Sequence, residues 1–74
     1  MDGDVRINAR GLSAPGPRLM AEAALAKGHP ALLRVVVSSR SAADDVSDYL
    51  RSVGASVEID HVGAEVHVVA RFSA

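Results

Sequence analysis

The residues best placed to do chemistry in this chain surround a strand-to-helix junction, where residues 10–17 read Arg-Gly-Leu-Ser-Ala-Pro-Gly-Pro. Apolar and polar residues alternate before this segment, and residues that strongly favour helices follow it. Position 14 is therefore predicted to be the N-cap, with Pro15 as the first helical residue. Free N–H groups and the positive end of the helix dipole would lower the pKa of a thiol at such a position. The residue present is Ala14, which has neither a nucleophile nor an acceptor that could cap the helix.

Ser13 carries the nearest alternative nucleophile. An unactivated hydroxyl is weak and needs an adjacent base, and the predicted topology places none of the three histidines beside it. Ser13 is therefore interpreted as a turn residue that supplies a local cap. The chain contains no cysteine, which excludes disulfides, thiolate metal sites and thiol chemistry.

Size and charge limit the classes of function. The chain of 74 residues predicts a single domain over residues 1–74, and 49% of its residues are hydrophobic. A net charge of −1 provides no field that would attract nucleic acid or an anionic membrane. The acidic start, Met-Asp-Gly-Asp, does not resemble a signal peptide, and no apolar run approaches the ~20 residues of a membrane span. We expect a cytoplasmic protein that does not bind membranes.

The hydrophobic pattern predicts two strands and two helices in the first part of the chain. Alternation over residues 5–9 predicts a half-buried strand, and the apolar residues 32–37 predict a central one. Helices are expected over residues 15–27 and 42–53. Ser41 is predicted to cap the second helix in a capping box completed by Asp44, and Ser47 is placed on the solvent side of that helix.

The last part of the chain predicts a hairpin that turns at Gly63-Ala64, with Val62 paired to Glu65 and His61 to Val66. The order is then β-α-β-α-β-β, an α/β two-layer sandwich with a four-stranded mixed sheet and both helices on one face. The residues expected to be most buried are Val35, Val37, Val46, Leu50, Ile59 and Val68. The opposite sheet face is expected to be solvated and to carry Arg6, Asn8, Arg10, Arg34, Glu58, Asp60, His67 and Arg71.

Two other kinds of site are weighed and disfavoured. The hairpin register places His61 and His67 on opposite sides of the sheet, which argues against a shared metal ion, and His29 is expected in a surface loop. Nucleic-acid binding on the arginine-bearing sheet face lacks aromatic residues for base stacking, because Phe72 and Tyr49 are both predicted to point inward.

Taken together, these features resemble the TusA/SirA-type sulfur-carrier family over residues 5–72. The likeness lies in the sequence Gly-Leu-x-x-Pro-x-Pro between a strand and a helix, the Asp45-Val46 pair and Gly54. In that family the motif reads Gly-Leu-x-Cys-Pro-x-Pro, so Ala14 replaces the cysteine that carries a persulfide. Two further departures are Asn8, where an acid is usual, and Ser38-Ser39, where an acidic pair is usual.

The resemblance implies a sulfurtransferase-type persulfide relay without a bound cofactor. The partners would be a cysteine desulfurase as donor and a downstream sulfur acceptor, in tRNA thiolation, molybdenum-cofactor assembly, sulfur oxidation or another pathway. The motif residues around Ala14 would be Gly11, Leu12, Ser13, Pro15, Gly16 and Pro17. Two hypotheses remain open: a sulfur carrier that is inactive because its cysteine is replaced, by engineering or by natural loss, and a non-catalytic adaptor or regulatory domain that docks through the same region.

Overall fold

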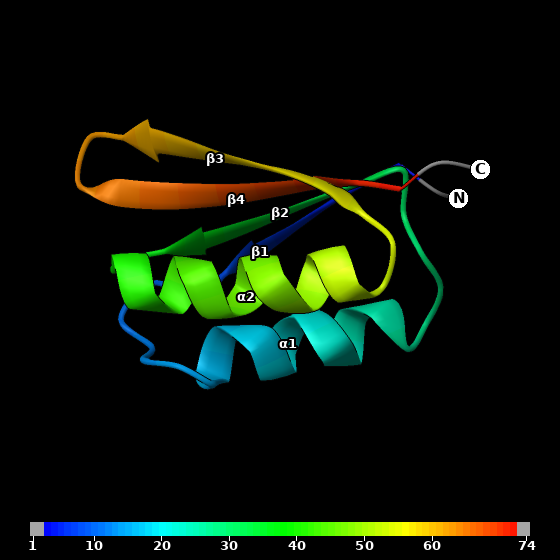
Figure 1. The fold of residues 1–74 in the computed structure, drawn as a ribbon, viewed down its shortest axis with the longest axis horizontal. Helices are drawn as coiled ribbons and strands as arrows, with labels where there is room; N and C mark the ends of the chain where they lie inside the picture. Colours follow the sequence, from blue (N-terminus) through cyan, green and yellow to red (C-terminus); the bar gives the residue numbers. More distant parts are fainter. Residues whose placement is uncertain (1–2, 73–74) are drawn as a thin grey trace.

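The computed structural model describes residues 3–72, and its element order is the predicted β-α-β-α-β-β. Two helices lie side by side on one face of a four-stranded sheet (Figure 1), which confirms the α/β two-layer architecture. The elements are β1 (Asp4–Asn8), α1 (Gly16–Leu25), β2 (Leu32–Val37), α2 (Arg40–Ser52), β3 (Ser56–Val62) and β4 (Glu65–Arg71).

The strands lie in the order β1-β2-β4-β3. β1 and β2 are parallel, whereas β4 is antiparallel to both β2 and β3. The hairpin pairs Val62 with Glu65 and His61 with Val66, as the turn at Gly63 predicts. β2 and β4 are therefore the central strands, and β1 and β3 are the edges.

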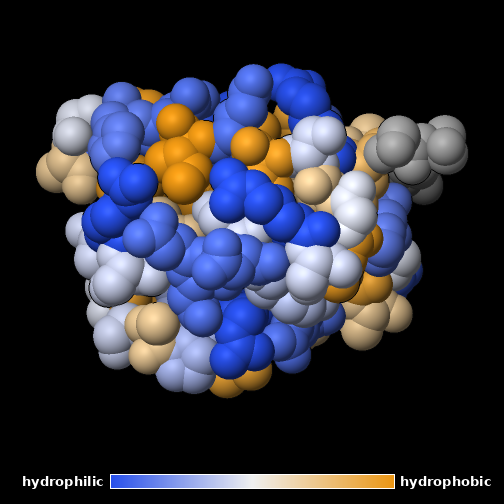
Figure 2. Space-filling view, viewed as in Figure 1, coloured by the Kyte–Doolittle hydropathy of each residue, from blue (hydrophilic) through white to orange (hydrophobic). Residues whose placement is uncertain are grey.

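The hydrophobic core lies between the sheet and the helices. Of the residues expected to be most buried, Val35, Val37, Val46, Leu50 and Val68 are fully inaccessible to solvent. The prediction for Ile59 is wrong, because this residue is only partly buried. Ile59 lies on the edge strand β3, and Figure 2 shows apolar surface in the space between β3 and α2. An edge strand has a neighbouring strand on one side only, which leaves its inward side chains less covered.

The two helices pack against each other and are bridged by one arginine. Arg18 of α1 donates from Nη1 to Glu22 Oε2 at 2.6 Å and from Nε to Asp45 Oδ2 of α2 at 3.1 Å. The hydrogen bond to Glu22, followed by that to Asp45, raises the pKa of Arg18 above its ordinary value. Ser47, expected in solvent, is 1% exposed, and its hydroxyl has no hydrogen-bond partner among the described residues. The prediction failed because it allowed α2 a single buried face, whereas the helix packs against both the sheet and α1.

The start of α2 also differs from the prediction. The N-cap is Ser39, whose Oγ accepts from the backbone N–H of Ala42 at 3.2 Å, and not Ser41. Asp44 does not close a capping box; it accepts from Arg40 Nε at 3.0 Å. Serines stand at both positions, and Ser39 becomes the cap because its backbone is still extended while the helix already begins at Arg40.

The sheet face turned away from the helices is less solvated than expected. Val36 and Val69 belong to the central strands and lie outside the main core, yet they are 1% and 3% exposed. His67 on the same face is 6% exposed, so its predicted exposure is wrong. The neighbouring strands carry long arginine side chains, and the stems of such side chains cover apolar atoms beneath them.

Candidate functional site

One end of the domain gathers the segments that the motif analysis singled out. β1 and β2 end there, both helices begin there, and the β3–β4 hairpin turns there (Figure 1). We call this end the apex and define it as residues 9–16, 38–40 and 63–65. No helix within residues 3–72 has the length and apolar character needed to cross a membrane.

The backbone holds the first apex loop in shape. Ala9 donates to the carbonyl of Val36 at 2.8 Å, which extends the β1–β2 pairing by one residue. Gly11 has φ +85°, a left-handed conformation that side chains disfavour, and its N–H donates to Ser38 Oγ at 3.1 Å. The loop is therefore tied both to β2 and to the segment that starts α2.

Position 14 is exposed but is not the N-cap. α1 begins at Gly16 with Pro15 as its N-cap residue. Ala14 is therefore the residue before the N-cap and not the predicted N-cap itself. A turn precedes the helix, in which the N–H of Gly16 donates to the carbonyl of Ser13 at 2.9 Å. Ser13 is thus a turn residue, as predicted, but its hydroxyl does not cap the helix, because α1 has no side-chain cap.

The other motif residues fix the approach of this loop to the helix. Pro17 is buried and begins the inner face of α1, which continues through Ala21 and Leu25. A Cβ on Gly16 would lie 3.3 Å from the Cβ of Leu12, so glycine allows the loop to lie close against the helix. The motif therefore specifies a rigid loop that presents position 14 to solvent.

Beside position 14, apolar side chains are exposed on the outer surface of α1. Leu12, Leu19 and Met20 are 43%, 51% and 39% exposed, and they are three of the five large hydrophobic residues that the described part of the chain exposes. Gly16, Leu19, Met20 and Ala23 recur at helical spacing on one side of α1, next to Leu12. We call Leu12, Gly16, Leu19, Met20 and Ala23 the apolar stripe. The sequence alone did not reveal the stripe, because α1 carries apolar residues on more than one side.

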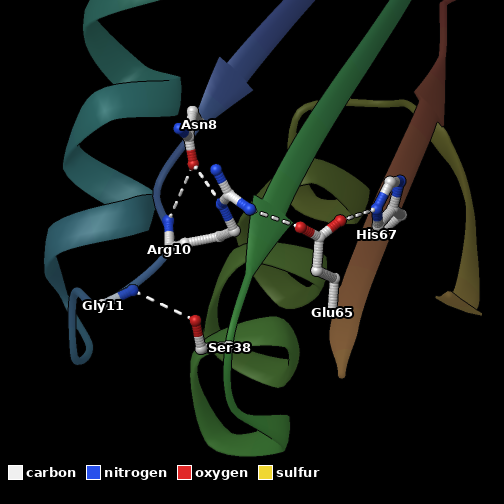
Figure 3. A network of polar contacts seen from close by, with 6 residues as sticks. All are labelled: Asn8, Arg10, Gly11, Ser38, Glu65 and His67. Carbon is white, nitrogen blue, oxygen red and sulfur yellow. Dashed lines mark hydrogen bonds and ion pairs between the residues drawn. The ribbon is translucent and has the colours of Figure 1, made fainter. Parts of the chain in front are cut away.

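A hydrogen-bonded network joins the apex to the outer sheet face (Figure 3). Arg10 donates from Nε to Asn8 Oδ1 at 3.0 Å and forms an ion pair with Glu65 at 2.5 Å. Glu65 Oε1 lies 2.9 Å from His67 Nε2, and His67 Nδ1 lies 2.9 Å from Arg34 Nη1. Because arginine can only donate, Nδ1 is the acceptor and the ring proton is on Nε2, which donates to Glu65.

Glu65 is the centre of this network. The hydrogen bond from His67, and then that from Arg10, holds the pKa of its carboxyl below the ordinary value of 4.5. Sequence reasoning did not single out Glu65, since its contact with Arg10 joins residues that are 55 positions apart. The carboxylate links the hairpin to the motif loop across the end of β2.

The residues that stand where the resemblance expects acids have structural partners of their own. Asn8 accepts from both the backbone and the side chain of Arg10. Ser38 accepts from Gly11, and Ser39 caps α2. At these three positions neutral side chains therefore accept local hydrogen bonds in place of the acids that the resemblance expects.

The family model described as sulfurtransferase TusA matches residues 5–71, which include the whole motif and position 14. The chain belongs to the TusA family. Among solved structures, the SirA-like protein from Desulfitobacterium hafniense is similar to it, with a TM-score of 0.80 and 21% identity over 90% of this chain and 95% of that one. At this identity the likeness shows the fold alone. No curated protein matches the chain.

Proposed function

We propose that this TusA-family chain is a sulfur carrier of the persulfide-relay type that is inactive as it stands, because position 14 holds alanine. The observation that carries the proposal is an exposed, otherwise complete motif loop in which this one position lacks a sulfur atom. In such a relay a thiolate takes the terminal sulfur of a donor persulfide, and the donor sulfur leaves as a thiolate. The methyl group of Ala14 can form no such bond.

The proposed partners are those of the family: a cysteine desulfurase as donor and a downstream sulfur-acceptor protein, in the cytoplasm. The apolar stripe supports docking of a protein next to position 14, because exposed apolar patches beside polar residues often mark interaction sites. Arg18 and Glu22 lie on the same helix, paired with each other, and supply a polar border. A partner seated on the stripe would cover the motif loop.

A second candidate function is a non-catalytic adaptor or regulatory domain that docks through the same apex. It is favoured by Asn8, Ser38 and Ser39, which stand in place of acids and accept hydrogen bonds in or directly beside the apex. The change at position 14 is therefore one of several at this site. An adaptor would occupy the desulfurase or the acceptor and block or bridge the relay without moving sulfur.

The first test is sulfur loading of the unmodified chain. Incubated with a cysteine desulfurase, cysteine and labelled sulfur, the protein is expected to retain no label once the donor is removed, since it has no thiol. Label that survives removal of the donor would disprove the assignment of position 14 as the missing sulfur site.

The second test restores the thiol. Ala14→Cys is expected to have a thiol pKa below the ~8.5 of free cysteine and to accept sulfur from the desulfurase. The decrease is expected to be less than about one pKa unit, because helix-dipole effects amount to ~0.3–1 kcal/mol. The matched control is Ala31→Cys, the same exposed substitution in the loop that leads into β2, at the other end of the domain. Ser47 cannot serve as a control, since it is buried.

The two candidates predict different outcomes for this pair of variants. Preferential loading of Ala14→Cys supports a carrier scaffold, whereas equal thiol pKa and equal loading of the two variants would leave the adaptor as the function. The adaptor has its own test: the unmodified chain should bind the desulfurase or the acceptor, and Leu19→Asp should weaken that binding at least about tenfold. Asp48→Asn, an isosteric change of an 85% exposed side chain on α2, should leave binding unchanged.

A further inference from the structure

The outer sheet face carries opposite charges on its two sides. Arg6 and Arg34 lie on β1 and β2, and Glu58 and Asp60 lie on the edge strand β3. Strand alternation places all four on the face away from the helices, because the intervening Ile7, Leu33 and Val35 belong to the core cluster and Val57 and Ile59 pack against it.

The strand registers arrange these residues in straight rows across the sheet. One row runs Arg6, Arg34, Val69, Glu58, and the next runs Asn8, Val36, His67, Asp60. In each row the two polar or charged ends lie on β1 and β3, and a valine lies on one of the central strands. In these two rows the face is therefore basic or polar toward β1 and acidic toward β3, with Val36 and Val69 between them. A third row, which runs Asp4, Leu32, Arg71, Ser56, carries an acid on β1 and a base on β4, and the charge separation is confined to the two rows nearer the apex.

Within one molecule this arrangement opposes stability. Arg6 is directly opposite Arg34 in the parallel pair, and like charges at such positions are destabilising. Glu58 and Asp60 are two residues apart on the same side of β3, and neither forms an ion pair with another residue of the described range 3–72. Each side of the face thus presents charge that the opposite sign could neutralise.

We propose that the outer sheet face binds a second copy of this chain, with a two-fold axis parallel to the strands and centred between β2 and β4. This operation exchanges the two edges of the face while keeping each row at its own level. Arg6 of one copy then meets Glu58 of the other, and Asn8 meets Asp60, twice in each dimer. Packed sheets lie ~10 Å apart with strands inclined by ~30°, a spacing that arginine and glutamate side chains can bridge from the two sides.

A second copy fits this face better than other occupants. A nucleic acid would be attracted by Arg6 but repelled by Glu58 and Asp60 on the same surface. Among the described residues the face offers no Phe, Tyr or Trp for base stacking, and the ring of His67 is buried. Val36 and Val69 are already buried, so a partner gains little apolar area from them. The dimer is accordingly weak, electrostatic and sensitive to salt. It leaves the apex and the apolar stripe open, and it goes beyond the proposed function without depending on it.

The first measurement is sedimentation velocity of the unmodified protein over a range of concentrations. At low ionic strength we expect a concentration-dependent shift from monomer toward dimer, and in about 1 M salt, where the Debye length is ~3 Å, we expect monomer. A protein that stays monomeric at low ionic strength up to its solubility limit would refute the proposal.

Charge reversal tests the geometry. Arg6→Glu and Glu58→Arg should each raise the dimer dissociation constant about tenfold or more, because each places like charges opposite one another twice. An equimolar mixture should recover association, since Glu at position 6 of one chain then faces Arg at position 58 of the other. The control Asp48→Arg reverses an exposed charge on α2 and should leave the dissociation constant unchanged.

The remaining outcomes are also decisive. Asp60→Lys is an independent reversal on β3, one row from Arg6 of the second copy, and should weaken the dimer in the same direction but by less than Glu58→Arg. An unfolded Glu58→Arg variant therefore does not prevent the test. A mixture that associates no better than the separate variants would contradict the two-fold arrangement. Oligonucleotide binding that is lost in Arg6→Glu and strengthened in Glu58→Arg would assign the face to nucleic acid and overturn the dimer.

Discussion

The two strand-to-helix junctions at the apex are built by different means. The β2–α2 junction consists of Ser38 and Ser39, whose hydroxyls accept from Gly11 and Ala42. The β1–α1 junction spans residues 9–15, has no side-chain cap and is held mainly by backbone hydrogen bonds. The first loop therefore leaves the side chains of residues 12–14 free to face solvent. A loop that presents residues to a partner benefits from a fixed backbone that does not consume its side chains.

The largest expected effect concerns the backbone of the β1–α1 junction, which is the longer of the two. Gly11→Ala should lower the free energy of unfolding by about 1–2 kcal/mol, because φ +85° is costly for a residue with a Cβ. No heavy atom lies within 4 Å of the added Cβ, so the loss reports backbone strain and not a clash. Urea denaturation measures this loss of stability. Gly3→Ala is the control, because Gly3 lies in an equally open environment but does not have a positive φ. Equal stability of the two variants would show that the β1–α1 junction does not depend on the left-handed conformation of Gly11.

The next effect concerns the side-chain cap of the shorter junction. Ser39→Ala should cost about 1 kcal/mol of unfolding free energy, because the N–H of Ala42 loses its acceptor. Ser41→Ala is the matched control, two residues away, and should change stability by less than about 0.5 kcal/mol. If Ser41→Ala proved the more damaging of the two in urea denaturation, the cap would lie where the sequence first suggested.

A smaller effect is expected where the two junctions meet. Ser38→Ala removes the acceptor of the Gly11 N–H, an exposed contact, and should cost about 0.5 kcal/mol. The same variant should increase hydrogen exchange at the amide of Gly11 more than at the amide of Ala42. Unchanged exchange at Gly11 would mean that the longer junction keeps its shape without help from the shorter one.

The smallest effect is a pH dependence that reaches the longer junction through Glu65. The pKa of this carboxyl is lowered in the folded protein, so its contribution is present above its ordinary value of 4.5 and is lost as pH falls through the lower folded-state pKa. Urea denaturation of the unmodified chain should therefore show stability decreasing below about pH 4.5. Glu65→Gln should flatten that decrease and leave most of the remaining pH profile intact. An identical acid dependence in both proteins would exclude Glu65 as its source.

The sequence was sufficient for features that rest on local pattern. The alternation in the last two strands and Gly63 defined the hairpin register, and the prolines and glycines separated the helices from the strands. The family resemblance over the motif was confirmed by the matched family model. These signals are local because each depends on residues that are neighbours in the chain.

The features that the sequence did not predict depend on where distant elements meet. Ser47 is buried because α1 covers a second side of α2, which the periodicity of α2 alone does not reveal. The network through Glu65 joins the motif loop to the hairpin, and no local pattern links them. The choice between Ser39 and Ser41 as cap depends on the exact residue at which the chain leaves the extended conformation.

The first and last strands reach the same end of the sheet, since Asp4, Leu32 and Arg71 lie in a single row. That row is at the far end of the strands from the apex (Figure 1). A linker attached beyond either strand would therefore start from the end of the sheet opposite position 14. The domain can be anchored to a sensor surface or fused to a reporter at either side of the described residues with its motif loop still facing the solution, so binding of a partner can be measured without the attachment interfering.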